Sequence, residues 1–239
     1  AWKNITSDEW ILDTVTHCHI EFSSMPVQTI CPRPISFNGS EIHLIDNEIQ
    51  NLLHKGAIVQ VTPCQGQFLS NIFLRPKKDG SMRPIINLKG LNEFVAYQHF
   101  KMETLEFALT LIRSDCYMAS IDLKDAYFTI PMAQEHQKIL RFQWRDKIWQ
   151  FTCLCFGLAS APRIFTKVMK PVVATLRNIG HISANYIDDS LLIGDTVDEC
   201  NENVHARCSL LRELGFVINE EKSHFSPTQV LDFLGFTIN

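Results

Sequence analysis

Three aspartates have a spacing that could bring their carboxylates together for chemistry. Asp188 and Asp189 are adjacent between two short apolar runs, and Asp122 precedes Asp188 by 66 residues (188 − 122). Adjacent residues of a regular strand point to opposite faces, so this pair can face one ligand only at a turn. Residues 181–186 and 190–194 have the pattern of a hairpin, which places the pair at its turn. A solvated turn without function is the alternative interpretation of an Asp-Asp pair taken alone.

If the strand that carries Asp122 neighbours this hairpin, three carboxylates converge on one point. Charged carboxylates in contact repel and raise one another's pKa, so such a cluster is stable chiefly around a cation. Mg²⁺ suits oxygen ligands that leave coordination positions open for substrate phosphates. Two such ions can stabilise the attacking and leaving oxygens of a phosphoryl transfer. The aspartates therefore indicate metal-dependent phosphoryl-transfer chemistry.

The alternation of residues 117–123 predicts the strand that must position Asp122. One face carries the apolar residues Ala119, Ile121 and Leu123. The opposite face carries Ser120, Asp122 and Lys124. Because the side-chain period of a strand is two, Asp122 should point away from the core.

The elements around the aspartates mix strands with helices. Pro162 stands where a first helical turn tolerates proline, and Pro171 should kink the helix that follows. A capping box at Thr196 and Glu199 predicts a further helix that ends at Gly215. Helices that cover one face predict an α+β sheet whose other face is free to hold a ligand.

The upstream half of the chain predicts a helix and a hairpin. Apolar residues recur at helical spacing over 42–52, with Ser40 as a candidate N-cap and Gly56 just past the end. Two apolar runs, 68–74 and 83–88, flank an Asp-Gly turn, which is typical of a β-hairpin.

The tip of this hairpin is basic. Between positions 75 and 89, the basic residues are Arg75, Lys77, Lys78, Arg83 and Lys89, against Asp79 as the one acid. A local cationic strip can grip phosphates while the rest of the surface stays acidic. An ordinary solvated loop is the alternative.

Composition predicts a folded, intracellular protein that does not hold nucleic acid by bulk charge. The chain of 239 residues is 46% hydrophobic, which is enough for a real core, and its net charge is −4 with a pI near 6.1. No apolar run approaches the roughly 20 residues of a bilayer span, and the first residues lack the layout of a signal peptide. Eight cysteines without a CxxC pair predict reduced, mostly buried thiols instead of a zinc site or a disulfide framework.

Four separate blocks of the sequence occur in the same order as in one known protein family. They are LRPKKDGSMRP at 74–84 with LKGLN at 88–92, IDLKDAYF at 121–128, FGLASAP at 156–162 with Phe165, and YIDD at 186–189, followed by LGF at 214–216, Lys222 and FLGF at 233–236. Over residues 57–239 they resemble the reverse transcriptases of retroviruses and long-terminal-repeat-like retrotransposons. The amino-acid sequence at 87–89, 121–125 and 160–162 is most similar to that of the tyrosine-recombinase class of retrotransposons.

The resemblance implies an α+β, right-hand polymerase fold. Residues 40–239 would form the fingers and the palm, with fingers from roughly 40 to 116 and part of 128–155. The palm core, about 117–127 and 156–239, would be an antiparallel sheet with helices on one face. Residues 1–39 match no motif and are expected to be an unassigned N-terminal extension. The thumb and RNase H regions are missing and are expected in a longer parent polyprotein.

The resemblance also implies roles in metal and nucleotide binding. Asp122 and Asp188 match the principal metal ligands and Asp189 the third carboxylate, for two Mg²⁺ ions with Mn²⁺ as a substitute. The nucleotide-binding set comprises Lys77 and Arg83 on the triphosphate, Asp125 and Ala126 through their backbone, and Tyr127 under the sugar. Phe156 stands where retroviral enzymes carry glutamine, so a contact there would be apolar. Tyr127 has the alternative role of a core aromatic.

Two further matches concern the leaving group and the primer. Lys222 matches a palm lysine proposed to give a proton to pyrophosphate, with a surface lysine as the alternative. Phe233, Leu234 and Gly235 match the primer grip, with a simple core strand as the alternative for Phe233 and Leu234.

These matches predict a DNA polymerase that copies a primed RNA or DNA template with deoxynucleoside triphosphates. The alternative is a non-catalytic, nucleic-acid-binding remnant of a polymerase palm. A binding module has no physical need for a repelling acid cluster, so Asp122, Asp188 and Asp189 favour the enzyme. A nucleotide cyclase is disfavoured by the basic hairpin and the terminal FLGF block.

Overall fold

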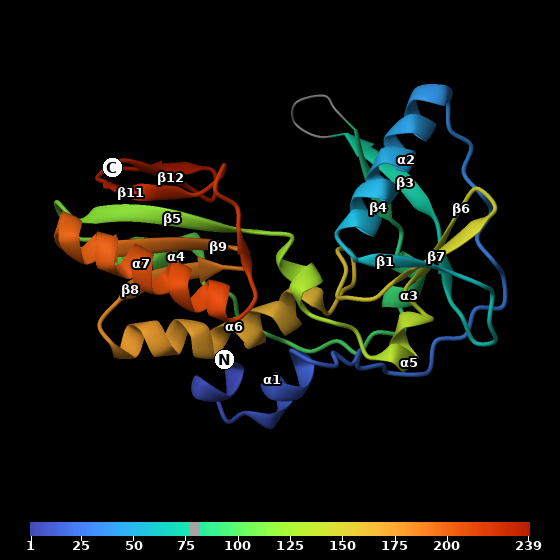
Figure 1. Cartoon of the computed structure of the whole chain (residues 1–239), viewed down its shortest axis with the longest axis horizontal. Coiled ribbons are helices and arrows are strands. Elements are labelled where there is room, and N and C mark those ends of the chain that lie inside the picture. The colour runs from blue at the N-terminus through green and yellow to red at the C-terminus, as the bar shows by residue number, and fades with distance from the viewer. Residues whose placement is uncertain (77–81) are drawn as a thin grey trace. The chain divides into compact units, whose positions relative to one another are not determined.

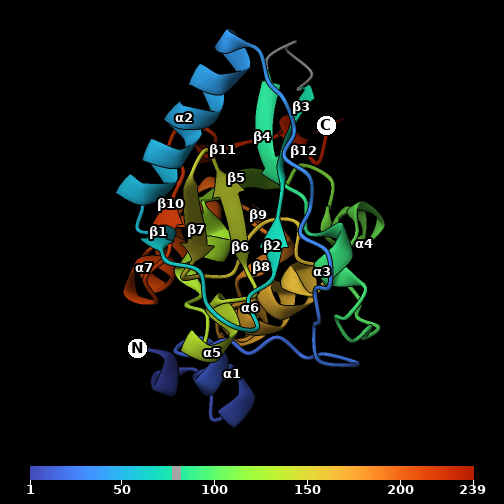
Figure 2. The same ribbon diagram turned by 90° about the vertical axis from the view of Figure 1, so that its right-hand side faces the viewer.

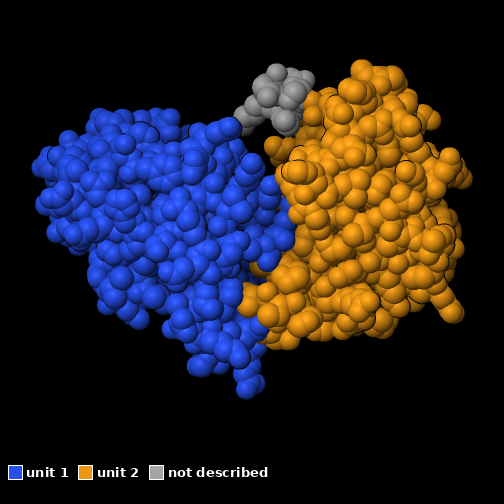
Figure 3. All heavy atoms as spheres, viewed as in Figure 1, with its two compact units in different colours: residues 1–12, 99–129, 162–239 blue, residues 13–98, 130–161 orange. Residues whose placement is uncertain are grey.

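A computed structural model describes residues 1–76 and 82–239 of the chain. These residues divide into two compact units, shown in different colours in Figure 3. Unit 1 comprises residues 1–12, 99–129 and 162–239, and unit 2 comprises residues 13–98 and 130–161. Residues 1–12 and 99–116 therefore cluster with the strand that carries Asp122, although the sequence placed them outside the palm.

An antiparallel sheet forms the centre of unit 1 (Figure 1). Its strands run in the order β10 (Val217–Ile218), β5 (Tyr117–Lys124), β9 (Asp189–Gly194) and β8 (Ile182–Tyr186), and β11 (His224–Thr228) also pairs with β5. The apolar face predicted for residues 117–123 is confirmed, since Ala119, Ile121 and Leu123 are buried.

Helix α7 (Val197–Glu213) packs against this sheet through a buried stripe of Cys200, Val204, Cys208 and Leu211. The predicted capping box of Thr196 and Glu199 is present. Gly194 is required where the helix meets β9, because a Cβ there would lie 2.3 Å from the Cys200 backbone nitrogen. The second long helix, α6 (Ala161–Asn178), continues through Pro171.

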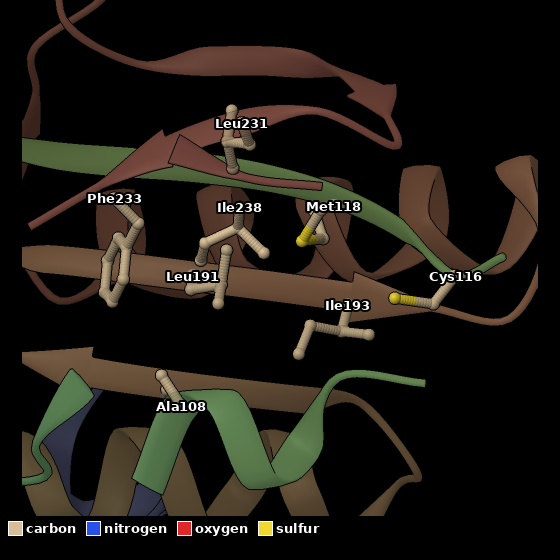
Figure 4. Packing of buried hydrophobic residues seen from close by; sticks show 9 residues of the cluster. Ala108, Cys116, Met118, Leu191, Ile193, Leu231, Phe233 and Ile238 are labelled. Atoms are coloured by element: carbon tan, nitrogen blue, oxygen red, sulfur yellow. The ribbon is translucent and has the colours of Figure 1, made fainter. Parts of the chain in front are cut away.

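The opposite face of the sheet is not free over its whole length, so that prediction is wrong in part. A hairpin of β12 (Leu231–Phe233) and β13 (Phe236–Ile238) and the short helix α4 (Leu105–Leu111) cover Met118, Leu191 and Ile193 (Figure 4). These side chains share the face of Asp122 but are apolar, and burying them is favourable. Only the polar end of this face, with Ser120 and Asp122, stays half-buried.

Unit 2 is built on a sheet of four strands. Their order is β1 (Ile58–Val61), β7 (Lys147–Phe151), β6 (Arg141–Trp144) and β2 (Leu69–Ser70), and the β2–β6 pair is parallel. The predicted hairpin is present as β3 (Ile72–Pro76) and β4 (Met82–Ile86), in antiparallel register. Its predicted tip, including Lys77, lies outside the described residues.

Helix α2 (Gly39–His54) lies beside this hairpin in Figures 1 and 2. Its N-cap is Asn38 and not Ser40, because the Asn38 side chain accepts from the Glu41 backbone N–H while the Glu41 carboxylate accepts from the Asn38 N–H. Gly56 follows the helix at φ +68°, as a C-terminal glycine should.

The remaining elements are short. They are the 3₁₀ helices η1 (Trp2–Asn4) and η2 (Ala126–Thr129), and the helices α1 (Glu9–Thr14), α3 (Lys89–Asn92) and α5 (Gln134–Gln137). All eight cysteines are free thiols and six of them are buried, as predicted. Within the described ranges, no helix has the length and apolar character needed to cross a bilayer.

Candidate active site

The pairing of β5 with β9 brings two of the three predicted aspartates face to face. Asp122 is directly opposite Asp189 in the antiparallel register. Directly opposite residues have their Cβ atoms about 4.5–5.5 Å apart and their side chains on one face of the sheet. The predicted neighbourhood of the two strands is therefore confirmed.

The third aspartate, Asp188, lies in the turn between β8 and β9. Tyr186 pairs with Asp189, so Ile187 and Asp188 form a two-residue turn, in which Ile187 has φ +54°. The prediction that both aspartates lie at the turn is therefore wrong for Asp189, which is the first residue of β9. The Asp188 carbonyl accepts a hydrogen bond of 3.1 Å from the Leu123 N–H. This bond ties the turn to β5 next to Asp122.

The electrostatics of the group reflect this crowding. Burial, followed by the charges of Asp188 and Asp122, raises the pKa of Asp189 to about 6. Burial also raises the pKa of Asp188, with a further contribution from Asp122. Lys222 opposes both shifts. Burial and the neighbouring carboxylates together therefore disfavour the charged forms of Asp188 and Asp189 more than Lys222 favours them.

Two residues that sequence reasoning missed hold Asp122. The Asn219 side-chain amide donates to Asp122 Oδ1 at 2.8 Å, and the Asn219 backbone N–H donates to the Asp122 carbonyl at 2.9 Å. The Asp122 N–H donates to Ser223 Oγ at 3.0 Å. Asn219 follows a strand of two residues, which is too short for a periodic pattern, so the sequence offered no signal for it.

A polar network fixes the base of the hairpin that carries Asp188 and Asp189. Ser190 Oγ donates to Asn185 Oδ1 at 3.0 Å, and the Asn185 N–H donates to Glu103 Oε2 at 2.7 Å. The other oxygen of Glu103 accepts from Arg177 of α6 at 2.7 Å. The hairpin is thus anchored to α6 and to the segment before α4.

Tyr127 lies in the same unit as the aspartates and is 5% exposed. Its ring packs edge-on against Phe165, with 5.4 Å between the ring centroids. Burial is the largest cause that raises the pKa of the Tyr127 hydroxyl, and the nearby Asp188 and Tyr186 add to it. Its neighbours along the chain are Asp125, at φ +52°, and the buried Ala126. The predicted set of 125–127 therefore lies close to Asp188.

The predicted primer-grip residues form the β12–β13 turn. Leu234 and Gly235 are its two central residues, both with positive φ (+51° and +84°), and Phe233 pairs with Phe236. The Phe233 side chain is 4% exposed and belongs to the core cluster. Leu234 also packs against this cluster, so both side chains contact the core, as in the alternative interpretation.

An open polar groove lies beside this hairpin. It is lined by Ser120, Lys222, His224, Val230, Leu231, Asp232 and Thr237, all in unit 1. Lys222 is exposed and lines this groove, and its charge lowers the pKa of Asp188 and Asp189.

Of the predicted nucleotide-binding residues that the structure describes, Arg83 and Phe156 belong to unit 2. Arg83 is exposed on β4, directly opposite the exposed Arg75 on β3. Phe156 is 50% exposed and precedes Gly157 at φ +94°. The Asn92 side chain donates to the Gly157 carbonyl and accepts from the Ala159 N–H, both at 2.8 Å, which fixes this loop.

The donor set of unit 1 fits Mg²⁺. In the described residues, no group of three or more acidic, histidine or cysteine side chains is arranged to hold a metal ion, so Asp122, Asp188 and Asp189 do not form a three-carboxylate site here. Mg²⁺ does not require one, since it usually binds through one or two carboxylates plus waters and substrate phosphates. The facing pair of Asp122 and Asp189, with Asp188 beside it, offers hard oxygens and excess negative charge.

Comparison with known proteins gives a consistent family. Residues 75–238 match the family described as reverse transcriptase (RNA-dependent DNA polymerase). The enzymatic polyprotein of figwort mosaic virus (strain DxS) is 23% identical over 218 residues, which cover 90% of this chain and 32% of that polyprotein.

Solved structures have the same fold. A foamy viral protease-reverse transcriptase in complex with dsDNA gives a TM-score of 0.77 at 26% identity, covering 91% of this chain and 44% of that one. A second, in complex with RNA/DNA hybrid, gives 0.71 at 26% identity, covering 87% and 28%. This chain thus spans less than half of each of these relatives.

Proposed function

We propose that this chain, which belongs to the reverse transcriptase (RNA-dependent DNA polymerase) family, adds deoxynucleotides to a primer 3′ end on an RNA or DNA template. The observation that carries the proposal is the register that sets Asp122 opposite Asp189 beside the Asp188 turn. The negative charges of these three carboxylates repel one another, and keeping them close is costly unless a cation and phosphates bind there.

Asp122 and Asp188 would be the principal ligands of two Mg²⁺ ions, or of Mn²⁺ as a substitute, and Asp189 the third carboxylate. When bound, the ions supply charge stabilisation for the oxygens of an in-line phosphoryl transfer. Asn219 keeps one Asp122 oxygen oriented through its amide. Lys222, beside the acids, would carry the proton for the pyrophosphate leaving group.

Arg83 and Lys77 would bind the triphosphate of the incoming nucleotide. The pairing of Arg83 with Arg75 supports this role, because like charges directly opposite on a hairpin are destabilising until an anion bridges them. Asp125 and Ala126 would contribute backbone contacts, and Tyr127 would lie under the sugar. Phe156, half-exposed on its fixed loop, would give an apolar contact.

The nucleic-acid partner would be a primed template. Relatives of known structure hold dsDNA and RNA/DNA hybrid. The β12–β13 turn of Phe233, Leu234 and Gly235 would hold the primer end, and the strands of this hairpin line the same groove as Lys222. Because the chain spans 32% of the viral polyprotein that it matches, we propose that thumb and RNase H regions belong to a longer parent polyprotein. The tyrosine-recombinase class of retrotransposons is our proposed origin.

Extension of a DNA primer on an RNA template, with and without Mg²⁺, tests the proposal. We expect extension with Mg²⁺ and none after chelation. The matched control is Asp146→Asn, which neutralises an exposed aspartate in the β6–β7 turn of unit 2 and should extend normally. Binding of the primed template without extension would contradict the polymerase and favour the non-catalytic remnant.

A further inference from the structure

The first twelve residues matched no motif, yet they belong to unit 1. The segment is ordered by its own hydrogen bonds. The Trp2 carbonyl accepts from the N–H groups of Ile5 and Thr6, and Asp8 Oδ1 accepts from the N–H groups of Trp10 and Ile11 at the start of α1. These bonds fix the positions of its two tryptophans.

Both tryptophans are packed against other parts of unit 1. The Trp10 ring faces α6, with Lys167 Nζ 3.8 Å and the Arg163 guanidinium carbon 5.9 Å from its centroid. Trp2 meets the ring of Phe216 edge-on, with 6.1 Å between the centroids. The segment therefore has two separate anchors.

The contact at Trp2 continues through the core towards the aspartates. Phe216 packs edge-on against Phe165 at 5.9 Å, and Phe165 packs edge-on against Tyr127 at 5.4 Å. Phe216 and Phe165 are both buried. Four rings in series thus connect residue 2 with the tyrosine beside Asp188.

We propose that Trp2 is a positioning residue for Tyr127, acting through Phe216 and Phe165, and that residues 1–12 therefore contribute to the choice of sugar. This rests on the proposed function, in which Tyr127 lies under the sugar of the nucleotide. Protein interiors are close-packed, so removal of the Trp2 ring gives Phe216, and through it Phe165 and Tyr127, room to shift. A displaced Tyr127 would leave more space for a 2′-hydroxyl.

The test compares kcat/KM for matched ribo- and deoxynucleotides on one primer–template. Trp2→Ala should reduce the preference for deoxynucleotides by roughly two- to tenfold, the range that the loss of one edge-to-face contact allows. Trp2→Phe should restore most of the preference because it returns a ring. Tyr127→Val, which removes the last ring itself, should reduce the preference at least as much.

Lys167→Gln is the matched control, since it weakens the Trp10 anchor and leaves the four rings intact. It should leave the sugar preference unchanged. If Trp2→Ala does not fold, the test uses Trp2→Leu instead, because leucine keeps apolar bulk but has no ring. An unchanged preference in a folded Trp2 variant would overturn the proposal.

A readout without activity separates this proposal from the proposed function. Double-mutant cycles in thermal unfolding should show coupling between Trp2→Leu and Tyr127→Val, although the two rings are not neighbours in the series. Additive effects would show that Trp2 merely covers Phe216, and the proposal would fail. If the wild-type chain does not extend primers but the coupling is present, the proposed function fails and the ring series stands.

Discussion

At the scale of single residues, Asp188 is the most direct test of the acid group. Asp188→Asn removes the charge of a proposed metal ligand, and it also relieves repulsion with Asp122. We expect nucleotide addition to be abolished, while the melting temperature without Mg²⁺ stays equal or rises. Primer extension and thermal unfolding of the same preparation measure both. Undiminished extension would contradict the assignment of Asp188 as a metal ligand.

The proposed binding of the triphosphate by Arg83 depends on the shape of the guanidinium as well as on its charge. A guanidinium can make two charge-assisted bonds to triphosphate oxygens, each worth about 1.5–3 kcal/mol, whereas lysine keeps the charge and loses the fork. Arg83→Lys should therefore raise the apparent KM for all four deoxynucleotides together. Arg212→Lys, at an exposed position in the last turn of α7, is the matched control. A defect limited to one base would show that Arg83 contacts the template instead.

At the scale of elements, the hydrogen bond between α5 and the segment at Ile20 depends on the protonation state of His136. His136 Nδ1 accepts a hydrogen bond of 2.9 Å from the Ile20 N–H, which a neutral imidazole alone can do. Burial, followed by the nearby His19 and Lys138, lowers the pKa of His136, and Glu135 opposes this shift. The depressed pKa means that the stabilisation is present above the ordinary value of 6.5 and is lost as the pH falls below it.

His136→Asn tests this pH dependence, because its side-chain oxygen can replace Nδ1 as acceptor without titrating. Between pH 8 and pH 5 (roughly the range in which histidines titrate), the melting temperature of the wild type should fall more steeply than that of the variant. Histidines that do not contact residue 136 cancel in the difference. Making the same comparison in a His19→Asn background removes the contribution of His19, whose ring packs edge-on against His136. Parallel curves would mean that the bond to Ile20 contributes nothing measurable.

Local patterns predicted the elements that position the aspartates. Alternation in 117–123 gave the face of Asp122, and two apolar runs around Asp188 gave the hairpin, because both depend on residues near in sequence. The N-cap of α2 was assigned to Ser40, since serine and asparagine cap equally well and only the contact with Glu41 selects Asn38.

Tertiary contacts could not be predicted in the same way. Asn219 reaches Asp122 from 97 residues away, and the hairpin of β12 and β13 covers a face that alternation alone left open. The role of Trp2 is of this kind, because its ring meets Phe216 more than 200 residues later. Each depends on the folded sheet and not on any local pattern.

At the scale of the whole molecule, the charge balance sets how nucleic acid can be held. The net charge is −4, so attraction over the whole surface does not favour a polyanion. Exposed Arg75 and Arg83 lie together on one hairpin instead. Binding of a primed template should therefore depend on few phosphate contacts, each of which releases counterions locally.

The salt dependence of affinity measures these contacts. Each phosphate neutralised on a duplex contributes about 0.9 to the slope of log K against log salt concentration. Arg75→Gln should make the slope shallower by about that amount, whatever the template sequence. Lys170→Gln removes one positive charge from the exposed side of α6 and is the matched control. It changes the net charge equally but should leave the slope unchanged, since a lysine that contacts no phosphate releases no counterion. Equal effects of the two substitutions would show that attraction is spread over the whole surface, and the basic hairpin would lose its special role in holding the template.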